Sequence, residues 1–180
     1  MRPLLAILTV VCVALSACGG EEQQQRPRSD QACPEGIPSL QARDIIGSTP
    51  KGYIVDRGDQ QAIGEIAGRI ADSVGSTMRD YDGRVLARRG ASAGTVVLVV
   101  NATKRSPTSE ELIGSMEANE QKLGLSGEDI SIGDTEGRLS TAVDGSYVAT
   151  APAGTCAIVM LIDERERRLR DAATLVMNDA

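Results

Sequence analysis

Residues 94–101 have the sequence GTVVLVVN, and residues 155–162 have the sequence TCAIVMLI. Both stretches are almost continuous runs of aliphatic residues. An alternation of apolar and polar residues is typical of a strand with one face in water, whereas a continuous apolar run is typical of a strand that is covered on both faces. We therefore predict that these two stretches are strands at the centre of one sheet, and the remaining elements are predicted around them.

Helical spacing marks three segments around these strands. From Asp59 to Asp80, apolar residues recur three and four positions apart, which is typical of a helix with one buried face. Thr108 and Glu111 match a capping box, with Ser106 as the alternative cap, so a second helix is predicted there. Asp163 is predicted to cap a third helix. The residues expected to face inward are Leu112, Met116 and Leu123 in the second helix and Leu169, Ala172, Ala173 and Val176 in the third.

Shorter strands complete the pattern. They are predicted at residues 53–55, 130–132, 139–143 and 147–149, with residues 85–87 as a further candidate. Asp144-Gly145 is a two-residue hairpin signal, and residues 151–154 are expected to turn. This order predicts an α+β fold, a two-layer sandwich whose mixed sheet ends in an antiparallel meander, with the helices packed on one face.

Composition limits both the domain organisation and the function. Residues 33–180 have the length of one domain, which begins with an entry segment that contains one short helical stretch at 39–46.

The chain of 180 residues has no His, no Trp, no Phe and a formal net charge of −6. A His-dependent triad, an imidazole base and a His metal ligand are therefore excluded. The lack of aromatic residues and the acidic balance argue against nucleic acid as a partner, and no cofactor or metal site is predicted.

The N-terminus has the pattern of an export signal. Arg2 precedes Leu4–Leu15, a nearly unbroken apolar run with the sequence LLAILTVVCVAL. About 20 apolar residues are needed to cross a bilayer, so this run is typical of a signal peptide or of a buried helix. Its position and the preceding Arg favour a secretory signal.

Leu15-Ser16-Ala17-Cys18 resembles the lipobox of bacterial lipoprotein signal peptides. The resemblance covers residues 1–18 only. It implies cleavage of residues 1–17, a diacylglyceryl group with fatty acids such as palmitate on Cys18, and a place on the extracytoplasmic face of the cell membrane. Two acyl chains give stable anchoring where one does not. The alternative is an ordinary signal peptide with a cysteine after the cut by chance.

The cysteine count agrees with this resemblance. Cys12 would leave with the signal peptide, so Cys18, Cys33 and Cys156 would remain, an odd number in an oxidising compartment. If Cys18 is acylated, Cys33 and Cys156 are left to form a disulfide, because secreted thiols usually pair. Such a bridge would close a loop of about 120 residues and contribute roughly 4–5 kcal/mol. The alternative is two separate buried thiols.

Residues 19–31, with the sequence GGEEQQQRPRSDQ, contain no apolar side chain. Such a segment has nothing to bury, so residues 18–32 are predicted to be the lipidated cysteine and a disordered tether. A flexible segment of this length has a root-mean-square reach of about 20 Å. We expect the domain to lie close to the membrane without entering it.

Several short motifs match functional patterns but lack the context that those patterns need. Gly90-Ala91-Ser92-Ala93-Gly94 fits G-x-S-x-G, but it precedes a strand and the chain has no His. Ser48-Thr49-Pro50-Lys51 fits S-x-x-K, but a strand follows where that chemistry needs a helix. Asp80-Tyr81-Asp82-Gly83 lacks the further ligands of a calcium loop and is interpreted as a solvated turn.

Other motifs have equally plain interpretations. Arg57-Gly58-Asp59 is interpreted as a turn before a helix, and Asn101-Ala102-Thr103 as a glycosylation acceptor that a bacterial lipoprotein would not normally use. The last helix carries Arg165, Arg167, Arg168 and Arg170. One hypothesis is that this face, with Arg84, Arg88 and Arg89, meets anionic lipid head groups. The alternative is an ordinary solvated helix.

Three functions are considered. The first is a non-enzymatic extracytoplasmic lipoprotein, whose domain is an interaction or accessory module for an unidentified envelope protein. The second is a binding protein for a small ligand or an envelope polymer, which would need a pocket near Tyr53, Tyr81 or Tyr147. The third is a hydrolase with two facing carboxylates. The first is favoured, because the sequence has no clear nucleophile–base pair or metal constellation.

Overall fold

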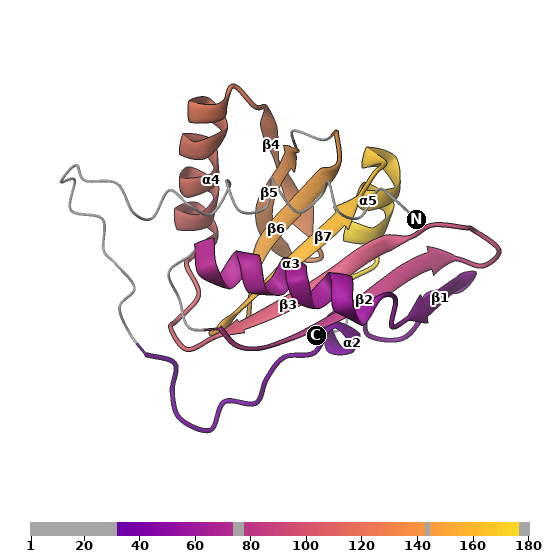
Figure 1. The fold of residues 1–180 in the computed structure, drawn as a ribbon, viewed down its shortest axis with the longest axis horizontal. Coiled ribbons are helices and arrows are strands. Elements are labelled where there is room, and N and C mark those ends of the chain that lie inside the picture. Colours follow the sequence, from indigo (N-terminus) through magenta and orange to yellow (C-terminus); the bar gives the residue numbers. More distant parts are fainter. Residues whose placement is uncertain (1–31, 74–77, 143–144, 177–180) are drawn as a thin grey trace.

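The fold is built on one sheet covered by helices (Figure 1). A computed structural model describes residues 32–73, 78–142 and 145–176. The strands are β1 (Tyr53–Asp56), β2 (Met78–Arg88), β3 (Thr95–Ala102), β4 (Gly127–Ile132), β5 (Thr135–Thr141), β6 (Tyr147–Ala153) and β7 (Ala157–Asp163). The helices are α2 (Ala42–Ile46), α3 (Gln60–Ser73), α4 (Ser109–Leu123) and α5 (Glu166–Ala173).

The strands lie in the order β1-β2-β3-β7-β6-β5-β4, and every neighbouring pair is antiparallel. The two apolar stretches form β3 and β7, which occupy the middle of the sheet and pair with each other, as predicted. The prediction of a mixed sheet is wrong. The strands from β4 to β7 form a meander in which each strand runs opposite to the one before it. The last of them, β7, lies beside β3 and is antiparallel to it, so no parallel pair occurs between the described strands.

Helices cover both faces of the sheet. Val97 and Val99 of β3 belong to a buried cluster that includes side chains of α2 and α5, whereas Leu98 belongs to a second cluster that includes side chains of α3. Figure 1 shows α3 lying across the strands at the centre of the sheet. The prediction that the helices pack on one face is not confirmed. Residues 96–100 of β3 are all apolar, so both faces of the strand need cover, and helices supply it on each face.

The start of α4 follows the predicted capping box. The hydroxyl of Thr108 accepts a hydrogen bond from the backbone N–H of Glu111, whose carboxylate accepts one from the N–H of Thr108. Leu112 and Met116 are buried as predicted. Leu123 is 42% exposed, which contradicts the prediction, because the buried stripe of the helix continues through Asn119 and Glu120 instead.

The segment after α3 differs most from the prediction. α3 ends at Ser73, and residues 78–88 form strand β2 rather than the end of a helix. Asp80-Tyr81-Asp82-Gly83 therefore lies within a strand and is not a turn. Its side chains alternate between the two faces, so that Asp82 binds α2 while Gly83 lies against Ile63 of α3. The candidate strand at 85–87 is confirmed as part of β2.

Strand boundaries differ from the prediction around the last turn. β6 continues through Ala153, so the turn begins at Gly154, and β7 begins at Ala157. Cys156 consequently lies in the turn before β7 and not within the strand. Val143 and Asp144 lie outside the described residues, although β5 and β6 on either side of them pair antiparallel as expected of a hairpin. Leu169, Ala172, Ala173 and Val176 are buried, as predicted for the last helix.

Gly83 and Gly64 lie at the contact between β2 and α3, where substitution by alanine has opposite expected effects. A Cβ atom at Gly83 would collide with Ile63, a side chain fixed in the core at 2% exposure. We expect Gly83→Ala to lower the free energy of unfolding by about 1–3 kcal/mol. A Cβ atom at Gly64 would meet the hydroxyl end of the exposed Tyr81 side chain, which can swing away.

Alanine favours a helix by about 1 kcal/mol over glycine, so Gly64→Ala should leave stability unchanged or raise it slightly. Urea unfolding of the two variants measures the difference. Equal destabilisation by both substitutions would contradict this description of the contact.

Candidate functional site

A disulfide joins the start of the domain to the centre of the sheet. Cys33 and Cys156 are bonded across a sequence separation of 123 residues, with their Cα atoms 6.0 Å apart. The N–H of Cys33 also donates to the carbonyl of Thr103 at 2.9 Å, and Ala32 forms a β-bridge with Lys104. The predicted pairing is confirmed, and the alternative of two separate thiols is wrong. The chain therefore enters the domain where β3 ends and β7 begins.

Polar side chains of β2 and β3 hold the entry segment on the sheet. The side-chain amide of Asn101 accepts from the N–H of Leu40 and donates to its carbonyl, both at 2.9 Å. Asp82 accepts from the N–H of Ala42 at 2.9 Å, and Asp80 accepts from the hydroxyl of Ser39. The two aspartates thus bind the protein's own backbone and hydroxyl groups. No group of three or more potential metal ligands occurs among the residues that the structure describes.

A buried ion-pair cluster attaches α4 to β5. Arg138 binds Glu120 at 2.7 Å, Asp129 at 2.8 Å and Glu117 at 3.1 Å, and the hydroxyl of Ser140 donates to Glu120. The side chains of Arg138 and Glu120 are only 10% and 7% exposed. The hydrogen bonds to Glu120 raise the pKa of Arg138 above its usual value, although burial alone would lower it. The guanidinium therefore stays charged.

The sequence patterns above do not predict this cluster. One signal for it is the spacing of Leu112, Met116 and Glu120, which are four residues apart and so place the carboxylate on the buried face of the helix. A second signal is Gly127 of β4, because any Cβ atom there would occupy the space of the Glu120 carboxylate. The charged groups of the cluster are bound to one another, so the cluster holds α4 in place on β5.

A second buried carboxylate organises the connection from β7 to α5. Asp163 accepts from the hydroxyl of Thr95 at 2.6 Å, from the N–H of Arg165 at 2.8 Å and from the guanidinium of Arg168 at 2.6 Å. Asp163 thus binds the backbone just before the helix, close to its predicted capping role, although the residue at the N-cap position is Arg165. The hydrogen bond to Asp163 raises the pKa of Arg168.

The arginines considered for lipid binding fall into two groups. One group is bound to carboxylates: Arg84 to Asp82, Arg88 to Asp171, Arg168 to Asp163, and Arg170 to Glu128 and Glu166. The other group, Arg89, Arg165 and Arg167, is exposed and forms no ion pair within the described part of the chain. The arginines predicted to form one lipid-binding face therefore differ in their contacts, and only the second group is free to bind an anion outside the protein.

An open groove of about 250 Å³ lies between β4, β5, β6 and the start of α5. Leu139, Thr141 and Tyr147 lie along it, and Glu128 and Glu166 stand at its side. Arg170 binds both carboxylates, with its Nε 2.8 Å from Glu166. Both carboxylates at the groove are thus engaged by a cation of the protein itself.

The remaining short motifs serve the fold. Residues 90–94 connect β2 to β3, and residues 48–51 connect α2 to β1, so neither lies at the helix that its catalytic pattern requires. Asp59 accepts from the N–H groups of Gln61 and Ala62 at the start of α3, as expected of a turn that leads into a helix. Asn101 of the glycosylation pattern is 2% exposed and holds the entry segment.

Cys18 lies outside the described residues, so its lipidation stays a prediction. Among the residues that are described, no helix is long and apolar enough to cross a membrane. Comparison of the chain with protein-family models, with curated proteins and with solved structures finds no match.

Proposed function

We propose that this chain is an exported lipoprotein, anchored to the extracytoplasmic face of the cell membrane through a diacylglyceryl group on Cys18. Its folded domain acts there as a non-enzymatic interaction or accessory module. The proposal combines the lipobox at residues 15–18 with the observed disulfide.

The Cys33–Cys156 disulfide carries the proposal. Disulfides persist in oxidising compartments and are rare in the cytosol, which supports export. The bridge also accounts for two of the three cysteines that follow the proposed cleavage site. Cys18 is then the single thiol left for acylation, at the position that the lipobox pattern requires.

The place where the chain enters the domain fits a tethered module. Ala32 and Cys33 are fixed at one end of the central strands by the β-bridge to Lys104 and by the disulfide. Residues 19–31 between this point and Cys18 carry no apolar side chain. A pull on such a tether would act on the disulfide and β3, which lies at the centre of the sheet.

The interior supports a non-enzymatic role. The buried carboxylates Glu120 and Asp163 are both occupied by arginine and by hydroxyl groups of the protein. Asp82 is likewise engaged by Arg84 and by the backbone of α2. Because each of these groups is bound within the fold, none is placed to move a proton of a substrate.

The groove beside Tyr147 favours a second candidate function, the binding of a small polar ligand. It lies at one of the three tyrosines where a pocket was expected for that function. Its volume of about 250 Å³ is at the small end of ligand sites and it is open to solvent. A ligand there would be the size of one sugar ring or amino acid and would be held weakly.

Labelling with radioactive palmitate in a bacterial host tests the proposed anchor. We expect label on the wild-type chain, which should partition with the membrane fraction, and no label on Cys18→Ser. The matched control is Cys12→Ser, which removes a cysteine from the proposed signal peptide and should keep both the label and the membrane location. Label that survives Cys18→Ser would overturn the proposal.

A further inference from the structure

The domain has two different ends along its central strands. The chain enters at one end, where Cys33 is bonded to Cys156 beside the last residue of β3. At the other end, β2 turns into β3 between Arg88 and Thr95, and β7 leads into α5. The length of β3 separates the two ends by about 23 Å, at roughly 3.3 Å per residue. The second end is therefore the one remote from the proposed anchor.

Four exposed cations gather at this remote end, namely Lys51, Arg89, Arg165 and Arg167, which we call the distal cationic surface. Lys51 lies beside the hairpin, because the N–H of Arg89 donates to the carbonyl of Gly52 at 2.8 Å. None of the four forms an ion pair with a residue that the structure describes.

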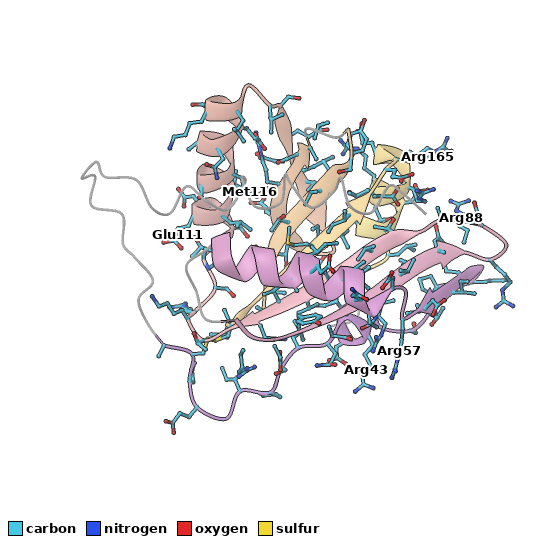
Figure 2. The ribbon with its side chains drawn as sticks, in the orientation of Figure 1. Arg43, Arg57, Arg88, Glu111, Met116 and Arg165 are labelled. Atoms are coloured by element: carbon cyan, nitrogen blue, oxygen red, sulfur yellow. A yellow bond between two sulfur atoms is a disulfide. The ribbon has the colours of Figure 1, made fainter. Side chains whose placement is uncertain are left out.

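The hairpin and α5 are joined across this surface. Arg88 binds Asp171 at 3.1 Å and lies over the ring of Tyr53, 5.7 Å from its centre. Arg167 precedes Asp171 by one helical turn and so lies on the same side of α5. Figure 2 shows Arg88 and Arg165 on the same side of the molecule, away from Arg43 and Arg57.

Local carboxylates do not neutralise the distal cationic surface. Asp163 and Asp171 at this end are already bound to Arg168 and Arg88. Glu164 is an exposed carboxylate in the same stretch, but it offsets one charge of the four. The chain as a whole has a net charge of −6, so an excess of exposed cations at one end is a local feature and not a consequence of composition. Such a surface attracts anions.

The chemistry of the surface favours a phosphate-bearing polymer over a folded protein. Protein interfaces centre on aromatic or aliphatic anchors that become buried. The exposed large hydrophobic side chains in the described residues are Ile54, Tyr81 and Leu123. Of these three, Ile54 is the one paired next to the β2–β3 hairpin, with Ala87, whereas Tyr81 pairs with Val100 toward the other end of β3. Guanidinium groups present a planar fork that matches phosphate oxygens, and three of the four cations are arginines.

We propose that the distal cationic surface binds a phosphate-bearing polyanion of the cell envelope. This rests on the proposed function for its location, since the chain enters the domain from the proposed anchor at the opposite end, at Cys33. The binding itself depends only on Lys51, Arg89, Arg165 and Arg167 and on the fold that places them together.

The test uses the purified full chain in an uncharged detergent, with linear inorganic polyphosphate as the probe. The triple variant Arg89→Gln/Arg165→Gln/Arg167→Gln should bind polyphosphate about tenfold more weakly at low salt, because each exposed charge contact contributes modestly. The matched control, Arg43→Gln/Arg57→Gln/Lys122→Gln, removes the same charge from exposed positions elsewhere and should change affinity by no more than about twofold. The single variant Arg89→Gln at the exposed hairpin should show a smaller loss in the same direction.

Two further probes in the same binding assay identify the kind of anion that the distal cationic surface binds. Polyglutamate tests an acidic protein, and vesicles that contain phosphatidylglycerol test the membrane. Equal weakening of polyphosphate binding in the triple variant and its control would overturn the proposal. It would also be overturned if polyglutamate or these vesicles bound as tightly as polyphosphate and the triple variant lost that binding too. The mass of the same sample reports whether Cys18 is acylated, so a failure of the anchor and a failure of the surface are distinguished.

Discussion

Replacement of both bonded cysteines, Cys33→Ser with Cys156→Ser, should lower the free energy of unfolding by about 4–5 kcal/mol. The bridge closes a loop of 123 residues, so its loss gives the unfolded chain a large gain in conformational freedom. A cost of this size is a large fraction of the stability of a single domain, which is about 5–15 kcal/mol. Urea unfolding of wild type and variant measures the difference in free energy.

The effect can be attributed to the bridge by adding a reductant. The midpoint of the wild type should fall toward that of the variant when the protein is reduced, whereas the midpoint of the variant should not move. A double variant as stable as the oxidised wild type would show that the contacts of Asn101 and Asp82 with the entry segment suffice to hold it.

Arg138→Met should lower the free energy of unfolding by about 3–5 kcal/mol. It leaves the carboxylate of Glu120, which is 7% exposed, without its cation in the contact between α4 and β5. Replacing both charges, in Arg138→Met with Glu120→Leu, should recover most of the loss, because the desolvation of an unpaired charge is then removed. Thermal unfolding of the three chains measures both effects.

The matched control is Arg170→Met. Arg170 also binds two carboxylates, Glu128 and Glu166, but these side chains are 60% and 43% exposed. Exposed ion pairs contribute roughly 0–1 kcal/mol, so this substitution should have a small effect. Similar losses for Arg138→Met and Arg170→Met would contradict the importance assigned to burial.

The elements that could be predicted from the sequence are those with an unambiguous local signal. The continuous apolar runs predicted β3 and β7 and their central position, and the capping box of Thr108 and Glu111 predicted the start of α4. Cysteine counting predicted the disulfide. In each case the local pattern and the tertiary environment favour the same structure.

Where local and tertiary preferences differ, the prediction was wrong. Met78 continues the helical spacing of α3, and residues 80–83 have the composition of a turn. They form part of β2 instead, because pairing with β3 and contacts on both faces of the strand outweigh these local signals. The strand directions and the division of helices between faces depend on long-range pairing, which a single sequence does not display. The Glu120–Arg138 cluster was missed because a glutamate on the buried stripe of a helix resembles an ordinary surface residue until its partner on β5 is known.

The distribution of arginines illustrates the same limit. Arg165, Arg167, Arg168 and Arg170 look equivalent along the sequence, yet Arg168 and Arg170 are bound to carboxylates. Only the three-dimensional arrangement separates arginines that stabilise the fold from those that remain exposed. It also brings Arg89 of the hairpin and Lys51 to the same end of the domain as α5.

Three cysteines follow the proposed cleavage site, and we propose that Cys18 is acylated while Cys33 and Cys156 are paired. This division can be measured as the intact mass of the chain purified from bacterial membranes, after alkylation with and without prior reduction. We expect a chain that begins at Cys18 and carries a diacylglyceryl group, with no alkylated thiol before reduction and alkylation of Cys33 and Cys156 alone after it. A chain of unmodified mass, or alkylation of Cys18, would show that Cys18 carries no lipid.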